Sequence, residues 1–222
     1  NVSLEALNWD KNTAVVSGVM PRKSWLNRPP IANATEVFVV LSILEPAFDF
    51  DQASRFLITA EKTSLKVNLI LTKRDLISED NLRLTEMRLI EWGYNPYSIS
   101  LFSGQGLDNL LDKLKKVQLA VLCGPSGVGK SSLLNYFMPD VSLLVAPVSR
   151  KLKRGRHTTR NVQLYSLKQG SFIADTPGFN RPALDILPKE LALLFPEIRI
   201  RLIDKKCKFR DCLHREEPGC VV

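Results

Sequence analysis

The chain has few of the features that mark secreted or membrane proteins. It contains four cysteines in 222 residues, and none of its apolar runs approaches the length of a membrane span. We find no secretory signal segment, no internal repeat and no low-complexity tract. We therefore expect an intracellular protein without a membrane partner. It would be cytoplasmic in a bacterium, or lie in an organellar stroma or matrix if a transit peptide has been removed.

Acidic residues are scarce relative to basic ones. Thirty-one lysines and arginines stand against 23 aspartates and glutamates, which gives a formal net charge of +8. Such a balance favours a polyanionic partner such as RNA. The basic residues that could contact phosphates gather in three segments: Arg22, Lys23 and Arg28; residues 150–160, which hold no acidic residue; and Lys205, Lys206, Lys208 and Arg210.

Apolar runs alternate with amphipathic stretches along most of the chain. Strands are expected at 36–43, 66–72, 96–100 and 117–123, and helices at 51–64, 78–92, 107–116 and 131–138. A hairpin is expected from 161–167 and 171–175, and a last helix at 188–195. Strands that alternate with helices predict right-handed βαβ units, a mostly parallel sheet and hence the α/β class.

The first 35 residues differ from those that follow. They hold short β-prone pieces and end close to Pro29-Pro30, which indicates a boundary. We therefore expect a small β-domain at 1–35, an α/β domain at 36–187 and a cysteine-bearing segment at 188–222. Because the sequence starts at Asn1 and stops at Val222, we expect a processed or trimmed form, and we expect a monomer.

Residues 124–131 read Gly-Pro-Ser-Gly-Val-Gly-Lys-Ser and match the phosphate-binding loop G-x-x-x-x-G-K-[ST]. In such a loop, backbone N–H groups surround the phosphates, Lys130 reaches the β/γ oxygens and the Ser131 hydroxyl binds Mg²⁺. An expected strand precedes the loop and an expected helix follows it, whose N-terminus favours phosphate; a chance match is the alternative. The predicted phosphate ligands are Gly124, Ser126, Gly127, Val128, Gly129, Lys130, Ser131 and Ser132.

Two further segments fit a nucleotide switch. Asp175-Thr-Pro-Gly178 follows an expected strand, so that the Asp175 carboxylate could hold Mg²⁺ through water and the Gly178 N–H could approach the γ-phosphate. An ordinary turn is the alternative. Within 150–160, a threonine hydroxyl could complete the Mg²⁺ shell while γ-phosphate is present. Thr158 and Thr159 are both candidates and we prefer Thr159; a mobile basic loop is the alternative.

A base reader is predicted upstream of the phosphate loop. Thr72-Lys-Arg-Asp75 ends the strand 66–72 in the manner of an N/T-K-x-D motif, in which the Asp75 carboxylate accepts hydrogen bonds from guanine N1–H and the exocyclic amine. The stem of Lys73 would lie along the base, and Ser100 would belong to the loop that supports it. A polar strand end is the alternative. Ordinary GTPases place these elements after the phosphate loop, so the order here is permuted.

Metal-binding residue types gather close to the C-terminus. Cys207, Cys212, His214 and Cys220 lie within 14 residues, and three thiolates with one imidazole suffice for a closed tetrahedral zinc site. Because such a site has no open position, a single zinc ion would be structural. A redox cluster is the alternative. Cys123, in the strand before the phosphate loop, is expected to be a small buried apolar residue.

Together these motifs resemble the circularly permuted GTPases, and more specifically the ribosome small-subunit-dependent GTPase family RsgA/YjeQ. The resemblance implies a circularly permuted P-loop GTPase domain with Mg²⁺ and GTP, preceded by the last strands of an OB-like β-domain and followed by a zinc module. It also implies GTP hydrolysis stimulated by the small (30S) ribosomal subunit and its rRNA, in late maturation of that subunit. The segments that carry it are 28–33, 72–75, 124–132, 155–159, 175–179 and 207–220.

The resemblance assigns a catalytic role and includes one departure. Phe179 stands where Ras-like enzymes carry the glutamine that orients the attacking water, and the resemblance suggests that His157 does this work. Thr72 stands where the family usually has asparagine, which predicts the loss of one bracing hydrogen bond at the base site. Asp75 should still select guanine.

Two other functions fit parts of the sequence. An ATP-using kinase or transport ATPase would share the phosphate loop, but Asp75 and the permuted order argue against it. An RNA-binding module with a weakly active nucleotide pocket would share the basic segments, but the intact Lys130, Ser131 and Asp175 argue against that.

Overall fold

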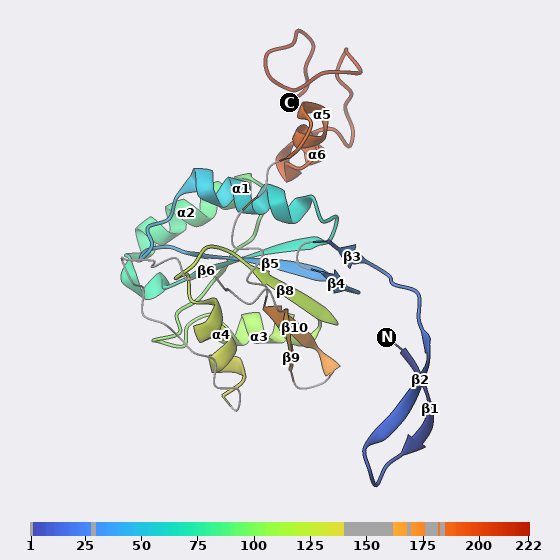
Figure 1. Cartoon of the computed structure of the whole chain (residues 1–222). Coiled ribbons are helices and arrows are strands. Elements are labelled where there is room, and N and C mark those ends of the chain that lie inside the picture. Colours follow the sequence, from blue (N-terminus) through green and yellow to red (C-terminus); the bar gives the residue numbers. More distant parts are fainter. Residues whose placement is uncertain (1, 28–29, 140–161, 168–169, 176–181, 183–184) are drawn as a thin grey trace, which may run out of the picture.

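The computed structural model describes residues 2–27, 30–139, 162–167, 170–175, 182 and 185–222. Its centre is a six-stranded sheet with helices on both faces (Figure 1). A β-hairpin near the N-terminus extends away from the sheet, and the C-terminal segment lies beyond α1. Among the described residues, no helix combines the length and the apolar character that a membrane crossing needs.

The strand order of the sheet is β7-β6-β5-β8-β10-β9, in which only β9 runs antiparallel to its neighbour. Because parallel strands end at the same edge, the residues that follow β6, β7 and β8 are brought together there, next to Asp175 at the end of β10. The expected α/β architecture with a mostly parallel sheet is confirmed. The strands are β5 (Glu36–Ser42), β6 (Lys66–Thr72), β7 (Tyr97–Ser98), β8 (Leu119–Cys123), β9 (Gln163–Ser166) and β10 (Phe172–Asp175).

Two pairs of helices cover the two faces of the sheet (Figure 1). Helices α1 (Phe50–Glu61) and α2 (Glu79–Glu91) lie on one face, and α3 (Leu107–Lys115) and α4 (Lys130–Phe137) on the other. Asp49 and Ser78 cap α1 and α2 by accepting hydrogen bonds from first-turn backbone N–H groups. All four helices agree with the sequence prediction to within a few residues at each end.

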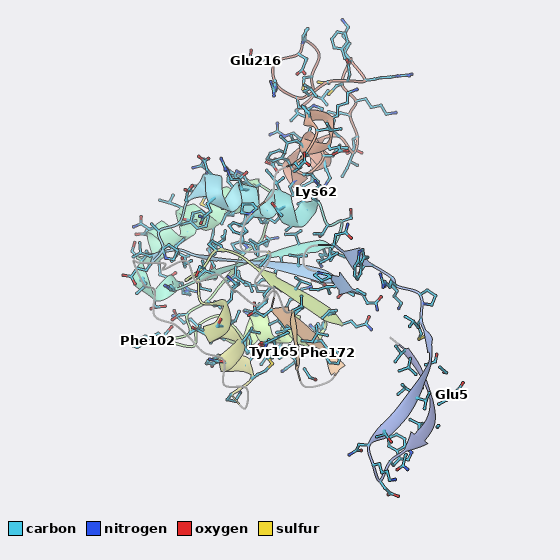
Figure 2. All side chains as sticks on the ribbon, viewed as in Figure 1. Glu5, Lys62, Phe102, Tyr165, Phe172 and Glu216 are labelled. Atoms are coloured by element: carbon cyan, nitrogen blue, oxygen red, sulfur yellow. The ribbon has the colours of Figure 1, made fainter. Side chains whose placement is uncertain are left out.

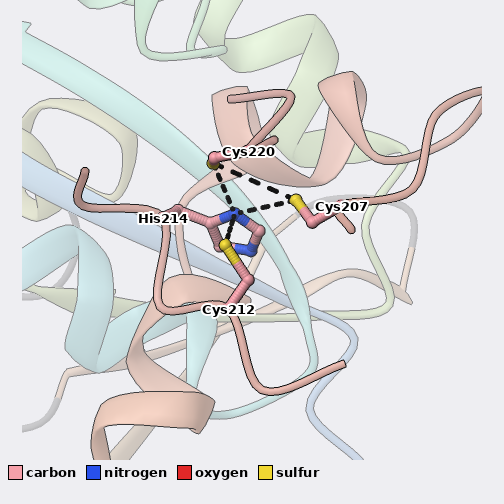
Figure 3. A group of neighbouring side chains, drawn as sticks. All are labelled: Cys207, Cys212, His214 and Cys220. Atoms are coloured by element: carbon pink, nitrogen blue, oxygen red, sulfur yellow. Dashed lines mark hydrogen bonds between the residues drawn. The ribbon is translucent and has the colours of Figure 1, made fainter. Parts of the chain in front are cut away.

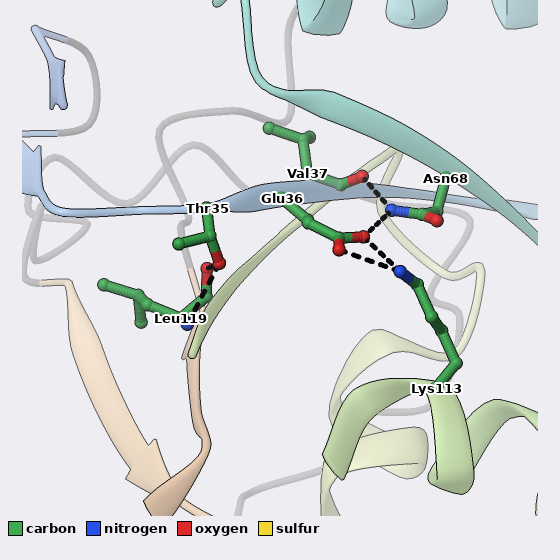
Figure 4. A network of polar contacts seen from close by, with 6 residues as sticks. All are labelled: Thr35, Glu36, Val37, Asn68, Lys113 and Leu119. Atoms are coloured by element: carbon green, nitrogen blue, oxygen red, sulfur yellow. Dashed lines mark hydrogen bonds and ion pairs between the residues drawn. The ribbon is translucent and has the colours of Figure 1, made fainter. Parts of the chain in front are cut away.

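A partly buried polar network lies near the start of β5 (Figure 4). The Glu36 carboxylate pairs with Lys113 Nζ at 2.6 Å and accepts a hydrogen bond from Asn68 Nδ2 at 2.7 Å. The network therefore connects β5, β6 and α3. Breaking a buried pair by removing one partner leaves an uncompensated charge, so these side chains favour one arrangement of the three elements.

The N-terminal part is a separate hairpin with little packing against the sheet. Strands β1 (Val2–Asn8) and β2 (Thr13–Val19) pair antiparallel, and nearly all their residues are exposed (Figure 2). A second short pair, β3 (Trp25–Leu26) and β4 (Ile31–Ala32), leads into β5. Leu26 and Ile31 are buried in the core beneath α1, which fixes this pair to the sheet.

The C-terminal part begins with two short helices instead of the single helix expected at 188–195. These are α5 (Pro188–Ala192) and α6 (Pro196–Arg201). Each has proline among its first residues, where the missing N–H costs nothing, and Pro196 begins a new helix where the prediction placed an end. From Leu202 onward the chain holds turns and irregular loops.

The C-terminal part contacts the core at the end of α1. The Glu61 carboxylate, 11% exposed, pairs with Arg199 at 2.9 Å and accepts the hydroxyl hydrogen of Tyr94 at 3.0 Å. Burial, together with the neighbouring Glu61, raises the pKa of Tyr94, so the phenol stays protonated. The turn at Gly93 lies so close to Pro196 that a Cβ there would lie 2.8 Å from the proline Cβ. These contacts fix α6 against the core.

Candidate nucleotide site and metal centre

The predicted phosphate loop connects β8 to α4, as the sequence indicated. Its three glycines adopt left-handed conformations, with φ of 140° at Gly124, 84° at Gly127 and 96° at Gly129. At Gly124, a Cβ would lie 2.0 Å from the carbonyl oxygen of Val40 on β5. The loop therefore follows the sheet so closely that a side chain at this position does not fit.

Lys130 is the first residue of α4 and is held by the loop itself. Its Nζ donates to the carbonyl oxygens of Gly124 at 2.8 Å and Pro125 at 2.7 Å. Burial lowers the pKa of Lys130, while the carboxylate of Asp175 acts in the opposite direction. Asp175 ends β10, which is paired with β8. A cation, a carboxylate and the N-terminus of α4, with Ser131 and Ser132 in its first turn, thus meet at one edge of the sheet.

Thr72 connects the predicted base loop to the phosphate loop. It ends β6 and is 1% exposed, and its hydroxyl donates to the carbonyl oxygen of Val128 at 2.6 Å. Threonine therefore makes one bracing bond to the phosphate loop, and the loss of a further bond relative to asparagine stays a prediction. The threonine side chain is shorter than that of asparagine, but β6 ends close enough to the phosphate loop for the hydroxyl to reach the Val128 carbonyl.

Lys73 and Asp75 lie on the turn that follows Thr72. Lys73 has a left-handed backbone, with φ of 62°, and its Nζ donates to the carbonyl oxygen of Glu45 in the loop after β5. Asp75 is exposed on the short 3₁₀ turn η1 (Arg74–Leu76). Its carboxylate is thus available at the edge where the phosphate loop lies.

Ser100 shapes the neighbouring loop from inside. It is fully buried, and its hydroxyl oxygen accepts hydrogen bonds from the backbone N–H groups of Phe102 at 3.1 Å and Ser103 at 3.0 Å. The Ser100 N–H donates to the carbonyl oxygen of Gln105 at 3.0 Å, which closes the loop. Phe102 projects outward from this loop (Figure 2).

Two groups at the site were missed from the sequence. The carbonyl oxygens of Val128 and Glu45 hold Thr72 and Lys73, and backbone acceptors of this kind leave no signal in the residue pattern. The predicted switch and catalytic residues lie outside the described residues: His157, Thr158, Thr159 and Gly178.

One cavity lined by described residues does not coincide with this site. It measures about 520 Å³ and is lined by Ile31, Leu119 and Phe172 among others. Leu119 and Phe172 begin β8 and β10, so the cavity lies at the strand ends opposite the phosphate loop.

The four predicted metal ligands are brought together in the C-terminal loops (Figure 3). Their donor atoms all lie within 4.8 Å of one another. His214 Nδ1 lies 3.5 Å from the sulfur atoms of both Cys207 and Cys220 and 3.7 Å from that of Cys212. A tetrahedral zinc site with bonds of about 2.0–2.3 Å has edges of about 3.3–3.8 Å. The donor set could therefore hold a metal ion.

Glu217 fixes the loop that carries the predicted ligands Cys212 and His214. Its carboxylate accepts the backbone N–H groups of Leu213 at 2.7 Å and Arg215 at 2.8 Å, on either side of His214. These two hydrogen bonds hold the pKa of Glu217 at about 2, well below its usual value. His214 itself has a left-handed backbone, with φ of 58°. The bracing carboxylate holds the residues on both sides of this unusual turn.

A phosphate loop between a parallel strand and a helix, with the predicted base reader upstream of it, is typical of a P-loop nucleotide-binding protein of permuted order. A family model of RsgA GTPases matches residues 19–185. The "Small ribosomal subunit biogenesis GTPase RsgA" of Prochlorococcus marinus (strain MIT 9303) is 56% identical over 100% of this chain and 69% of its own length. The chain belongs to the RsgA GTPase family, and it is a GTPase.

Solved structures agree with this assignment. YjeQ from Thermotoga maritima has a TM-score of 0.77 and 33% identity, covering 99% of this chain and 73% of its own. YloQ, described as a circularly permuted GTPase, has a TM-score of 0.76 and 32% identity, covering 99% of this chain and 70% of its own. The permuted order expected from the sequence agrees with the description of YloQ.

Proposed function

We propose that this GTPase hydrolyses GTP to GDP and phosphate in the biogenesis of the small ribosomal subunit, with that subunit as its activating partner. The names of the bacterial relatives support the ribosomal role, and they favour the bacterial cytoplasm as its location. The single observation that carries the nucleotide chemistry is the bond from Thr72 to the Val128 carbonyl. It holds the base loop and the phosphate loop at one edge of the sheet.

We propose that guanine is read by Asp75, with the stem of Lys73 along the base and the loop built around Ser100 beneath it. Exposure of Asp75 on a short turn, close to the phosphate loop, supports this assignment. The phosphates would bind to the backbone N–H groups of the loop and to Lys130. The residues proposed to surround them are Gly124, Ser126, Gly127, Val128, Gly129, Ser131 and Ser132, with Gly178 toward the γ-phosphate.

We propose that Mg²⁺ is held by the hydroxyl of Ser131 and by Thr159 or Thr158, with Asp175 acting through water. The bound ion would neutralise charge on the β- and γ-phosphates. Lys130 supports this arrangement, because a buried ammonium beside Asp175 places positive charge where the leaving phosphate becomes more negative. His157 would orient the water that attacks the γ-phosphate in line.

We further propose three parts with separate tasks. Residues 1–35 form the end of an OB-like β-domain, 36–187 the permuted GTPase domain, and 188–222 a module with one structural zinc ion. The relatives are longer than this chain, and their extra length is consistent with a larger β-domain and a larger zinc module. The basic residues of the first and last parts, together with those at 150–160, would contact rRNA phosphates, so that binding to the subunit weakens steeply with salt. The protein would act as a monomer.

Nucleotide hydrolysis with and without purified 30S particles tests this function. We expect slow turnover of GTP alone, faster turnover with 30S particles and none of ATP. Asp75→Asn should lower GTP affinity and raise affinity for XTP, because xanthine carries an oxo group where guanine carries the amine that Asp75 accepts from. If ATP competed as well as GTP, or if 30S particles left the rate unchanged, the proposal would be wrong.

The role of His157 has its own test. His157→Ala should remove the stimulation by 30S particles while leaving GDP affinity within about twofold, because the imidazole acts on water and not on the nucleotide. A variant that keeps full stimulated turnover would show that another group orients the water.

A further inference from the structure

Arg74, the variable residue of the Thr72–Asp75 motif, contacts Ser98 and Ile99, directly before the loop built around Ser100. Its backbone N–H donates to the carbonyl oxygen of Ile99 at 3.2 Å. Its guanidinium reaches the carbonyl oxygen of Ser98 through Nη1 at 3.5 Å and the Glu79 carboxylate through Nη2 at 2.7 Å. One residue thus contacts the end of β7 and the first turn of α2.

The guanidinium is held in a confined place. The side chain of Arg74 is 21% exposed, and its Nε is buried without a hydrogen-bond partner among the described residues. Removing a charged group from water costs free energy. The Arg74 guanidinium would therefore extend into solvent unless contacts in this place held it. Glu79 is 74% exposed, and such a surface ion pair contributes little. At 3.5 Å the contact with the Ser98 carbonyl is long for a hydrogen bond, but it is the one that joins the guanidinium to the loop 98–106.

The Ser98 carbonyl belongs to a tightly packed loop. A Cβ on Gly106 would lie 2.4 Å from this oxygen. The backbone N–H of Gly104 donates to the Ser100 carbonyl at 3.0 Å, and the Ser100 N–H donates to Gln105. These bonds close residues 100–105 on themselves, and Gly106 packs against the Ser98 carbonyl, so a group that holds Ser98 lies where both ends of this loop meet.

We propose that Arg74 is a positioning residue for guanine recognition, holding the turn of Asp75 in register with the loop 98–106. This inference rests on the proposed function, in which Asp75 reads guanine. Asp75 is the next residue on the same short turn, so the direction of its carboxylate depends on where Arg74 is fixed. Lysine cannot reproduce the contacts, because it has one point charge instead of a planar fork that reaches Ser98 and Glu79 together.

Calorimetric titration with GDP and IDP tests this role. Hypoxanthine lacks the exocyclic amine of guanine, so the GDP-to-IDP affinity ratio reports how well the Asp75 carboxylate is aimed. Arg74→Ala should lower this ratio about fivefold, as expected when part of a charged hydrogen bond is lost. Arg74→Lys should give a smaller decrease. Arg83→Ala, which removes an exposed arginine from α2, should leave the ratio unchanged.

A double-mutant comparison separates positioning from general stability. In an Asp75→Asn background, Arg74→Ala should have no further effect on the ratio, because the group it positions is gone. Arg74→Ala that weakens GDP and IDP equally, or leaves the ratio unchanged, would overturn the inference while leaving the proposed function intact. If Arg74→Ala does not fold, as judged by circular dichroism, the same criteria apply to Arg74→Lys. A wild-type chain that binds ADP as well as GDP would overturn the proposed function, and this inference with it.

Discussion

The bond between Thr72 and Val128 predicts what happens when one hydroxyl is removed. The hydroxyl of Thr72 lies 2.6 Å from the Val128 carbonyl oxygen, and the side chain is 1% exposed. Valine has nearly the same shape but no hydroxyl, so Thr72→Val places a methyl group against a carbonyl oxygen. The substitution acts on the only described side-chain bond from Thr72 to the phosphate loop.

The expected cost follows from burial. Removing the donor of a buried hydrogen bond costs about 1–3 kcal/mol. For a chain of about 200 residues, each kcal/mol lowers Tm by about 2–4 °C, so we expect a decrease of about 2–12 °C. GDP affinity should fall about tenfold, or about 1.4 kcal/mol, because the base and phosphate loops lose their direct connection.

Denaturant unfolding and calorimetric GDP titration check both numbers. Thr59→Val is the matched control, because the Thr59 hydroxyl donates at 2.7 Å to the Arg55 carbonyl on the exposed side of α1. That hydroxyl bond is local to one helix, and its loss should change stability by less than about 0.5 kcal/mol. A Thr72→Val variant with wild-type Tm and wild-type GDP affinity would refute the reasoning.

Three further predictions concern backbone space, the C-terminal contact and the metal loop. Gly124→Ala should abolish GDP binding in titration, because its Cβ would lie 2.0 Å from the Val40 carbonyl oxygen. Glu61→Gln should speed hydrogen exchange in α6, because it weakens the 2.9 Å pair with Arg199, worth about 1 kcal/mol at such exposure. The Glu217 carboxyl should titrate near pH 2 by NMR. Because folding lowers this pKa, the ionised carboxylate stabilises the fold fully at any pH above the pKa of the unfolded chain. That stabilisation is lost as the pH falls toward 2.

Each of these has an outcome that contradicts it. Gly18→Ala is the control for the glycine test, since a Cβ there meets only Ser3 Oγ at 3.9 Å; equal GDP binding by both variants would show that the loop can move. Unchanged exchange in α6 after Glu61→Gln would mean that the helix is held by its apolar contacts. A Glu217 carboxyl that titrates near its ordinary value would mean that its two backbone hydrogen bonds do not persist in solution.

The sequence alone was sufficient for the features that depend on local spacing. The phosphate loop is eight consecutive residues between a strand and a helix, and the three cysteines and the histidine lie within 14 residues. The helix starts expected at residues 51 and 78 lie within one residue of those of α1 and α2, where Asp49 and Ser78 accept nearby N–H groups. The split of 188–195 into α5 and the start of α6 was missed, because a proline can end one helix or begin another.

Tertiary structure decided the contacts between residues far apart in the chain. Thr72 and Val128 are separated by 56 residues, and they meet because β6 and β8 flank β5 with their carboxyl ends at one edge. Ser100 was predicted as a ligand from its motif, whereas its burial beneath its own loop depends on packing around β7. Short patterns record what a backbone segment can do by itself; the packing of the sheet determines which segments it meets.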